Sequence, residues 1–226
     1  MDIMNFEKKS QKPLKELVYL ELKHKILTGE IPSQTRLMEV ELSEKLNVSR
    51  TPVREAIKRL TDDGLVQMEA RKGAYVAKIS IKEMLDVFEI REDMEGFCAY
   101  LAAIRSTPEE KAALRELAEG YELACERKDK MEIIRYDEEI HNYIVSCCNN
   151  ETLKQLVNYV QELSLRFRYL YYEDDSRYMD TSQQHIRLIE AIENGDADKA
   201  RKLADQHVRA IREFVYNLRK TLEDAD

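Results

Sequence analysis

The stretch VSRTPVREAI, residues 48–57, joins a helix start to a high density of positive charge. Ser49 is a favourable N-cap residue, and Pro52 falls in the first helical turn, where its missing N–H costs little. Arg50 and Arg54 are four residues apart, so a helix that begins here carries both on one face. The stretch therefore predicts a helix whose first turn presents two arginines together, and it raises the question of what they bind.

The segments around this helix complete a recognisable order of elements. Apolar residues at helical or alternating spacing, together with the positions of glycine and proline, set the boundaries that we expect. The expected segments are a helix over 13–29, a turn over 29–37, a helix over 38–48, and strands over 65–68 and 74–79 joined by a hairpin tip at 70–73. Three helices followed by a two-stranded hairpin predict a winged helix-turn-helix.

That layout gives the two arginines a target. A helix-turn-helix protein inserts the second helix of the motif into the major groove of DNA, with its amino-terminal residues at the bases. Arginine suits both guanine edges and phosphates, and Ser49 and Thr51 can donate to phosphates at the helix start. Arg71 and Lys72 at the hairpin tip can reach a further phosphate or the minor groove. The alternative for the arginines is a solvated helix face, but the complete layout favours DNA.

Charge and composition agree with two domains that have different partners. Residues 1–80 carry 15 Lys and Arg against 12 Asp and Glu, whereas the remainder carries 21 against 32. There is neither a membrane-length apolar run nor the apolar block of a signal peptide. The four cysteines lack C-x-x-C spacing, which is typical of a reduced cytoplasmic protein. Vicinal Cys147 and Cys148 are either a redox pair or two ordinary helical residues.

From Ser80 onward the chain predicts only helices. Ser80 and Glu83 have capping-box spacing, as do Thr107 and Glu110. Six helices are expected, over about 81–104, 107–127, 130–147, 151–173, 177–194 and 196–223. The predicted fold is therefore mainly α, with a winged helix-turn-helix domain over 1–79 and an all-α helical bundle over 80–226.

Three histidines of the second domain can converge on one site. Asp137 and His141 are four residues apart and share a helix face. His185 and His207 lie among apolar residues of two later helices. Imidazole and carboxylate ligands together suit Zn²⁺, Ni²⁺, Mn²⁺ or Fe²⁺. The alternative is that each is an ordinary surface or core histidine, which is how we interpret His24.

The first domain resembles a known family. LSEKLNVSRTPVREAIKRLTDDGLVQMEARKGAYV, residues 42–76, closely resembles the winged-helix segment of GntR-family bacterial transcription regulators, and the resemblance covers roughly residues 13–77. It implies DNA contacts by Ser49, Arg50, Thr51, Arg54, Arg71, Lys72 and Gly73. Some relatives carry another DNA-contacting arginine where this chain has Val40. Arg36 is near that position in the sequence, but the resemblance assigns it no role.

The second domain resembles the FCD ligand-binding domain that defines the FadR subfamily, in its VanR-like branch. The matching segments are VFEIREDMEGFCAYLAA (87–103), DEEIH (137–141), QQHIRLIEAIENGDADKA (183–200) and DQHV (205–208). The resemblance implies that the metal ligands are Asp137, His141, His185 and His207.

The same resemblance implies an effector site beside the metal. Arg91 matches an arginine that commonly binds an effector carboxylate there, and the alternative is a helix-surface ion pair with Glu92, Glu95 or another acid. Tyr169 and Tyr172 either line that pocket or belong to the core.

Together these observations predict a homodimeric, metal-containing transcription regulator that is not an enzyme. We expect a repressor more often than an activator, a palindromic double-stranded DNA operator, zinc as the first-choice metal and a small carboxylate effector. One alternative keeps DNA binding but makes the bundle only a metal-stabilised dimerisation module. Another is a metal-dependent hydrolase, which is disfavoured because no general base or nucleophile motif accompanies the ligands.

Overall fold

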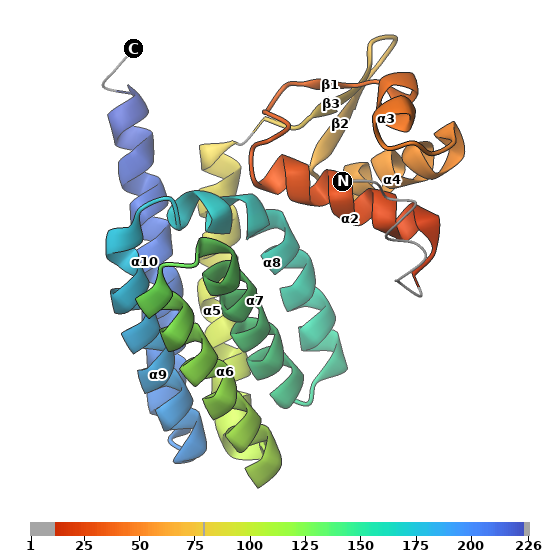
Figure 1. Cartoon of the computed structure of the whole chain (residues 1–226). Coiled ribbons are helices and arrows are strands. Elements are labelled where there is room, and N and C mark those ends of the chain that lie inside the picture. The colour runs from red at the N-terminus through yellow and green to blue at the C-terminus, as the bar shows by residue number, and fades with distance from the viewer. Residues whose placement is uncertain (1–11, 79, 224–226) are drawn as a thin grey trace. The chain divides into compact units, whose positions relative to one another are not determined.

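The chain divides into two units, and the boundary falls between Ser80 and Ile81. The computed structural model describes residues 12–78 and 80–223 (Figure 1). The elements of the first unit are α2 (Leu14–Leu27), β1 (Arg36–Leu37), α3 (Glu39–Lys45), α4 (Arg50–Asp62), β2 (Val66–Glu69) and β3 (Gly73–Val76). These are the three helices and the hairpin of a winged helix-turn-helix, as predicted.

The small sheet contains one strand that the sequence did not predict. Its order is β1-β3-β2, and both pairings are antiparallel. Arg36 pairs with Tyr75 and Leu37 pairs with Ala74, although only a turn was expected over 29–37. A strand of two residues is too short for an alternating pattern, so only its pairing with β3 identifies it.

The start of α4 differs in one detail from the prediction. Ser49 occupies the N-cap position with an extended backbone, but its side chain makes no capping hydrogen bond. Pro52, Val53 and Leu60 are buried and fix α4 onto the unit's core. Because the cap hydroxyl is not engaged with its own helix, it remains available at the exposed end of α4.

The hairpin tip takes the left-handed backbone that its sequence requires. Arg71 has φ 66° and Gly73 has φ 105°, the second of which strongly favours glycine. Strand β3 ends at Val76, three residues earlier than expected, and Ile79 lies outside the described residues.

The second unit is an all-α bundle, as predicted. Its described residues form the helices α5 (Ile81–Arg105), α6 (Pro108–Arg127), α7 (Lys130–Cys147), α8 (Glu151–Tyr171), α9 (Tyr178–Glu193) and α10 (Ala197–Glu223), with a 3-10 turn, η1 (Asp175–Arg177), before α9. The predicted capping box is present at the start of α6, where Thr107 and Glu110 bond reciprocally. Since local capping sets these boundaries, the expected limits were close to the observed ones.

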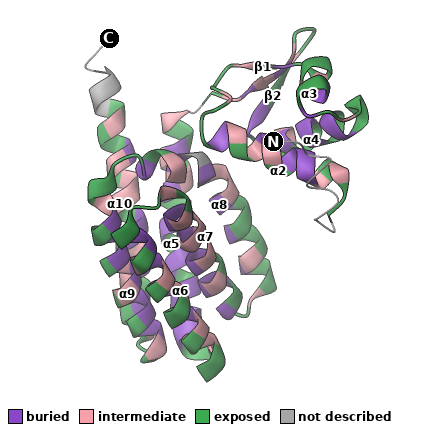
Figure 2. Cartoon of the chain, in the orientation of Figure 1, coloured by how far each residue is buried: buried purple, intermediate pink, exposed green. Residues whose placement is uncertain are grey.

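Helix α5 is central in the bundle because it packs against α7, α8, α9 and α10. Buried positions line the inner faces of the helices, and exposed positions line the outer faces (Figure 2). Several buried positions of the bundle are polar or charged, and they include Asp137, His141, His185 and His207. No helix among the described residues is long and apolar enough to cross a membrane.

Candidate functional site

The structure brings the four predicted metal ligands together in the core of the bundle. Asp137 and His141 come from α7, His185 from α9 and His207 from α10. One donor atom from each side chain lies within 4.8 Å of the others, and all four residues are buried. Residues far apart in the sequence therefore form one polar group, which we call the buried donor cluster.

Two of the histidines are oriented by partners outside the buried donor cluster. The Nδ1 of His141 lies 3.0 Å from an oxygen of Glu95, and the Nδ1 of His207 lies 2.9 Å from the side-chain oxygen of Gln184. Their Nε2 atoms face each other at 3.2 Å. A histidine that donates its Nδ1–H outward directs the lone pair of Nε2 inward, as metal-bound histidines do.

His185 is the member of the cluster that most needs a ligand. Both of its ring nitrogens are buried without a hydrogen-bond partner among the described residues, and its Nε2 lies 3.5 Å from Oδ1 of Asp137. Burial lowers the pKa of His185 to about 4, so the ring is neutral at pH 7. A buried neutral imidazole without a hydrogen-bond partner is costly unless something binds it.

Asp137 is held as a carboxylate by its surroundings. Nε of Arg168 lies 2.6 Å from Oδ2 of Asp137, and the hydroxyl of Tyr172 donates to Oδ1 at 2.8 Å. Tyr172 in turn lies 2.8 Å from the hydroxyl of Tyr121. Burial alone would raise the pKa of Asp137, but Arg168 and the three histidines outweigh it and hold that pKa below its ordinary value. The carboxylate is thus ionised and fixed in position.

This donor set fits a divalent transition metal. Three imidazoles and one carboxylate suit Zn²⁺, Ni²⁺, Mn²⁺ or Fe²⁺, and the unpartnered nitrogens of His185 are the atoms that such an ion would satisfy. A metal here would connect α7, α9 and α10. If its coordination number exceeded four, it would also offer positions to an anionic ligand.

Arg91 does not touch the cluster directly. It is buried, its Nε donates to Glu95 at 2.8 Å, and its Nη1 donates to Ser164 at 2.8 Å. The alternative to an effector role was a helix-surface ion pair with Glu92, Glu95 or another acid; Arg91 does pair with Glu95, but both side chains are buried. Because Glu95 also contacts His141, Arg91 is one residue removed from the cluster. Its role as an effector ligand stays a prediction.

Several residues around the cluster were not predicted. Arg168 and Gln184 lie on helices whose rotation about their axes is set by packing, so no spacing in the sequence identifies them as neighbours of the cluster. The sequence left open whether Tyr172 lines the pocket or belongs to the core. In the structure Tyr172 is fully buried, and its hydroxyl donates a hydrogen bond to Asp137. Tyr169 is half-buried and packs against the core.

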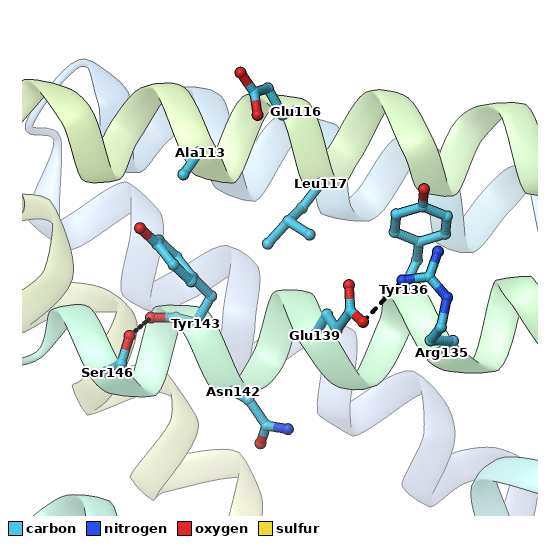
Figure 3. Close-up of a pocket in the computed structure, with 9 residues that line it drawn as sticks. All are labelled: Ala113, Glu116, Leu117, Arg135, Tyr136, Glu139, Asn142, Tyr143 and Ser146. Carbon is cyan, nitrogen blue, oxygen red and sulfur yellow. Dashed lines mark hydrogen bonds and ion pairs between the residues drawn. The ribbon is translucent and has the colours of Figure 1, made fainter. Parts of the chain in front are cut away.

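A second face of α7 lines a surface hollow with α6 (Figure 3). Leu117 of α6 and Tyr143, Glu139 and Asn142 of α7 contribute to it, and Glu139 accepts a hydrogen bond from Arg135. None of the four cluster residues lines this hollow. Helix α7 therefore separates an outer, solvated face from the inner face that carries Asp137 and His141.

The predicted nucleic-acid contacts gather on the first unit. Ser49, Thr51, Arg71 and Lys72 are exposed. Arg50 and Arg54 are also exposed and line a groove with Gly73 of the wing. The structure thus places the amino-terminal end of α4 and one edge of the wing along one groove.

Glu39, which the sequence analysis did not single out, binds both Arg50 and Arg54. Glu39 of α3 accepts from Nε and Nη2 of Arg54 at 2.9 and 2.8 Å, and from Nη2 of Arg50 at 3.2 Å. Arg36 lines the same groove, and its guanidinium lies beside Gly73. Val40 is exposed on α3. Three arginines therefore line the groove, and the carboxylate of Glu39 orders two of them.

Comparison with known proteins matches both units. The family described as FCD domain matches residues 86–210, and the family described as bacterial regulatory proteins, gntR family, matches residues 14–76. The chain is 28% identical over 212 residues to the HTH-type transcriptional repressor RspR of Escherichia coli K12, covering 94% of this chain and 93% of that protein. It is 30% identical over 193 residues to the uncharacterized HTH-type transcriptional regulator YdhC of Bacillus subtilis 168, covering 85% and 84%.

Among solved structures, E. coli McbR/YncC matches the fold with a TM-score of 0.79 at 23% identity, over 92% of this chain and 99% of that chain. At this identity the likeness concerns the fold alone.

Proposed function

The chain belongs to the GntR family of bacterial regulatory proteins and carries an FCD domain, and on that premise we propose that this DNA-binding transcription regulator is a metal-containing repressor that responds to a small carboxylate. Its relatives are regulators of transcription and not enzymes. Repression is favoured because RspR, which matches over nearly the whole chain, is named a repressor.

The DNA-binding part of the proposal rests on the groove between α4 and the wing. Two exposed arginines at the amino-terminal end of α4 suit base edges, and the hydroxyls of Ser49 and Thr51 suit phosphates. Arg50→Ala and Arg54→Ala should each weaken binding to an operator duplex, selected from random DNA, by about 1–3 kcal/mol if the side chain reads a base. Unchanged affinity in both variants would remove these arginines from the interface.

The metal part rests on one observation, the convergence of four buried donors around the unpartnered His185. In the experiment, metal content is measured by mass spectrometry on the full-length protein purified without chelator. We expect about one transition-metal ion per chain, and its loss in His185→Ala and His207→Ala. His24→Ala is the matched control, because His24 is exposed in the other unit. Equal metal content in all variants would refute the site.

The effector part rests on the surroundings of the cluster. Arg168 is paired with Asp137 and Arg91 with Glu95, so the charge of a divalent ion bound in the cluster would stay uncompensated, which favours an anionic ligand over a neutral one. Calorimetric titration with acetate, lactate and citrate, on metal-loaded and metal-free protein, tests the idea. Binding that needs the metal supports a sensor. Metal-loaded protein that binds none of the three would favour a purely structural metal.

The proposed assembly is a homodimer on a palindromic operator. A two-fold protein places two identical α4 helices on two half-sites, so the symmetry of the protein is repeated in the DNA. A carboxylate can then regulate only if it binds the DNA-competent and the DNA-incompetent arrangements with different affinities.

A further inference from the structure

Arg36 of β1 places its guanidinium at the tip of the wing. Its neighbour Leu37 is buried, and because side chains alternate along a strand, that of Arg36 projects to the opposite, exposed face of the small sheet. Arg36 pairs with Tyr75, and its side chain extends to Gly73, two residues away on β3. A Cβ added at Gly73 would lie 3.7 Å from Nε of Arg36 and 3.8 Å from Nη2. The guanidinium therefore rests against the wing where Gly73 leaves room for it.

The positive charge of Arg36 is not neutralised within the first unit. Arg50 and Arg54 both bind Glu39, and Lys72 binds Glu69 at 3.0 Å. The guanidinium of Arg36, in contrast, has no hydrogen bond or ion pair with any residue that the structure describes, although it lines the same groove as the other two arginines. An exposed guanidinium in this state keeps its full charge and all five N–H donors for an external anion.

The groove that Arg36 lines suits the sugar-phosphate backbone of DNA. It lies between α4 and the strands of the wing, and four basic side chains line it against two acidic ones. When α4 enters the major groove of DNA and the wing tip reaches the neighbouring minor groove, the ridge of phosphates between those two DNA grooves passes between the two protein elements. A phosphate on that ridge meets Arg36 on the wing side of the protein groove.

We propose that Arg36 binds a backbone phosphate, and that it holds the DNA in the groove between α4 and the wing without reading a base. The proposal rests on the DNA contacts proposed above for α4, and it divides the work within the groove. Arg50 and Arg54 at the start of α4 distinguish one sequence from another, whereas Arg36 supplies affinity that is common to all sequences. Gly73 contributes the space in which the guanidinium of Arg36 is seated.

The test uses full-length Arg36→Gln, a selected operator duplex and a scrambled duplex, with affinities measured by fluorescence anisotropy at several salt concentrations. We expect the variant to bind both duplexes more weakly by the same factor, so that the ratio of the two affinities stays at the wild-type value. The slope of log affinity against log salt should become shallower by about 1 for each Arg36 that contacts a phosphate. Lys15→Gln is the matched control, because Lys15 is an exposed cation of the same unit outside the groove; it should bind like wild type.

Arg36→Lys is the second variant, because it keeps the charge and should restore the wild-type salt slope. An unchanged affinity and slope in Arg36→Gln, a loss confined to the operator, an equal loss in Lys15→Gln, or a slope in Arg36→Lys as shallow as that of Arg36→Gln would each overturn the proposal. Arg50→Ala and Arg54→Ala, measured in parallel, identify which proposal fails. If they weaken operator binding while Arg36→Gln does not, only the role of Arg36 falls; if all three bind like wild type, the α4 interface falls with it.

Discussion

At the scale of single residues, Glu39 decides how the two arginines of α4 are presented. It binds Nε and Nη2 of Arg54, the edge that would otherwise form a paired contact with guanine, and only one nitrogen of Arg50. Arg50 is therefore freer than Arg54 to turn toward a base. The pKa of Glu39 is lowered, chiefly by its hydrogen bond with Arg54, so the carboxylate stays charged at neutral pH.

We predict that Glu39→Gln binds random duplex DNA more tightly but discriminates less between operator and random DNA. An amide removes one negative charge from a surface that faces phosphates, and its single acceptor oxygen cannot order both arginines. Fluorescence anisotropy on a selected operator and on a scrambled duplex gives the ratio of affinities. Glu41→Gln is the control, since Glu41 is exposed on the same helix. A ratio unchanged from wild type, or equal losses in both variants, would contradict the role of Glu39.

The cysteines are predicted to react slowly. Burial raises the pKa of Cys125 to about 12, and burial also raises the pKa of Cys98 and Cys147. At pH 8 these groups are thiols, and only the thiolate attacks a disulfide reagent. Titration with a disulfide dye should detect few thiols in the native protein and all 4 after unfolding. Fast labelling of the native protein would instead favour Cys147 and Cys148 as a redox pair.

At the scale of elements, the helices of the bundle could be predicted because their boundaries are local. Thr107 accepts from the backbone N–H of Glu110, and the carboxylate of Glu110 accepts from the backbone N–H of Thr107. Strand β1 could not be predicted, because its two residues become a strand only by pairing with β3. Arg168 could not be predicted as a neighbour of Asp137 either, because its position depends on how α8 packs against α7.

The N-cap of α6 should make a measurable contribution to the free energy of unfolding. Thr107→Ala should lower the free energy of unfolding of the bundle by about 1 kcal/mol, the usual cost of losing a threonine cap. Thr152→Ala is the comparison, because Thr152 is exposed in the first turn of α8 and does not cap it. Urea unfolding followed by circular dichroism measures both variants. Equal stabilities for the two would mean that the capping box contributes nothing.

At the scale of the whole molecule, the four candidate metal ligands could be predicted, but the side chains that contact them, such as Gln184 and Arg168, could not. Asp137 and His141 share a helix face, which the sequence shows directly, whereas the convergence of His185 and His207 rests on the packing of the helices that carry them. The first unit carries the groove that we propose for DNA, and the second carries the buried donor cluster. In the proposed function, regulation means that an event in the bundle changes how two copies of α4 are held.

Removal of the metal should destabilise the second unit selectively. An ion that binds only the folded cluster stabilises it by mass action, and its loss leaves the buried nitrogens of His185 unsatisfied. We expect a chelator to lower the melting temperature of the bundle and added Zn²⁺ to restore it. The melting transition of the first unit, which lacks the cluster, should not respond. A melting curve unaffected by chelator, in protein shown to contain metal, would contradict a structural contribution of the ion.

Anomalous diffraction from crystals of the metal-loaded protein, collected on both sides of the zinc absorption edge, tests the central claim most directly. We expect one strong peak per chain, within bonding distance of Asp137, His141, His185 and His207. Crystals of protein that contains zinc by chemical analysis, but whose peak lies elsewhere or is absent from the cluster, would contradict it.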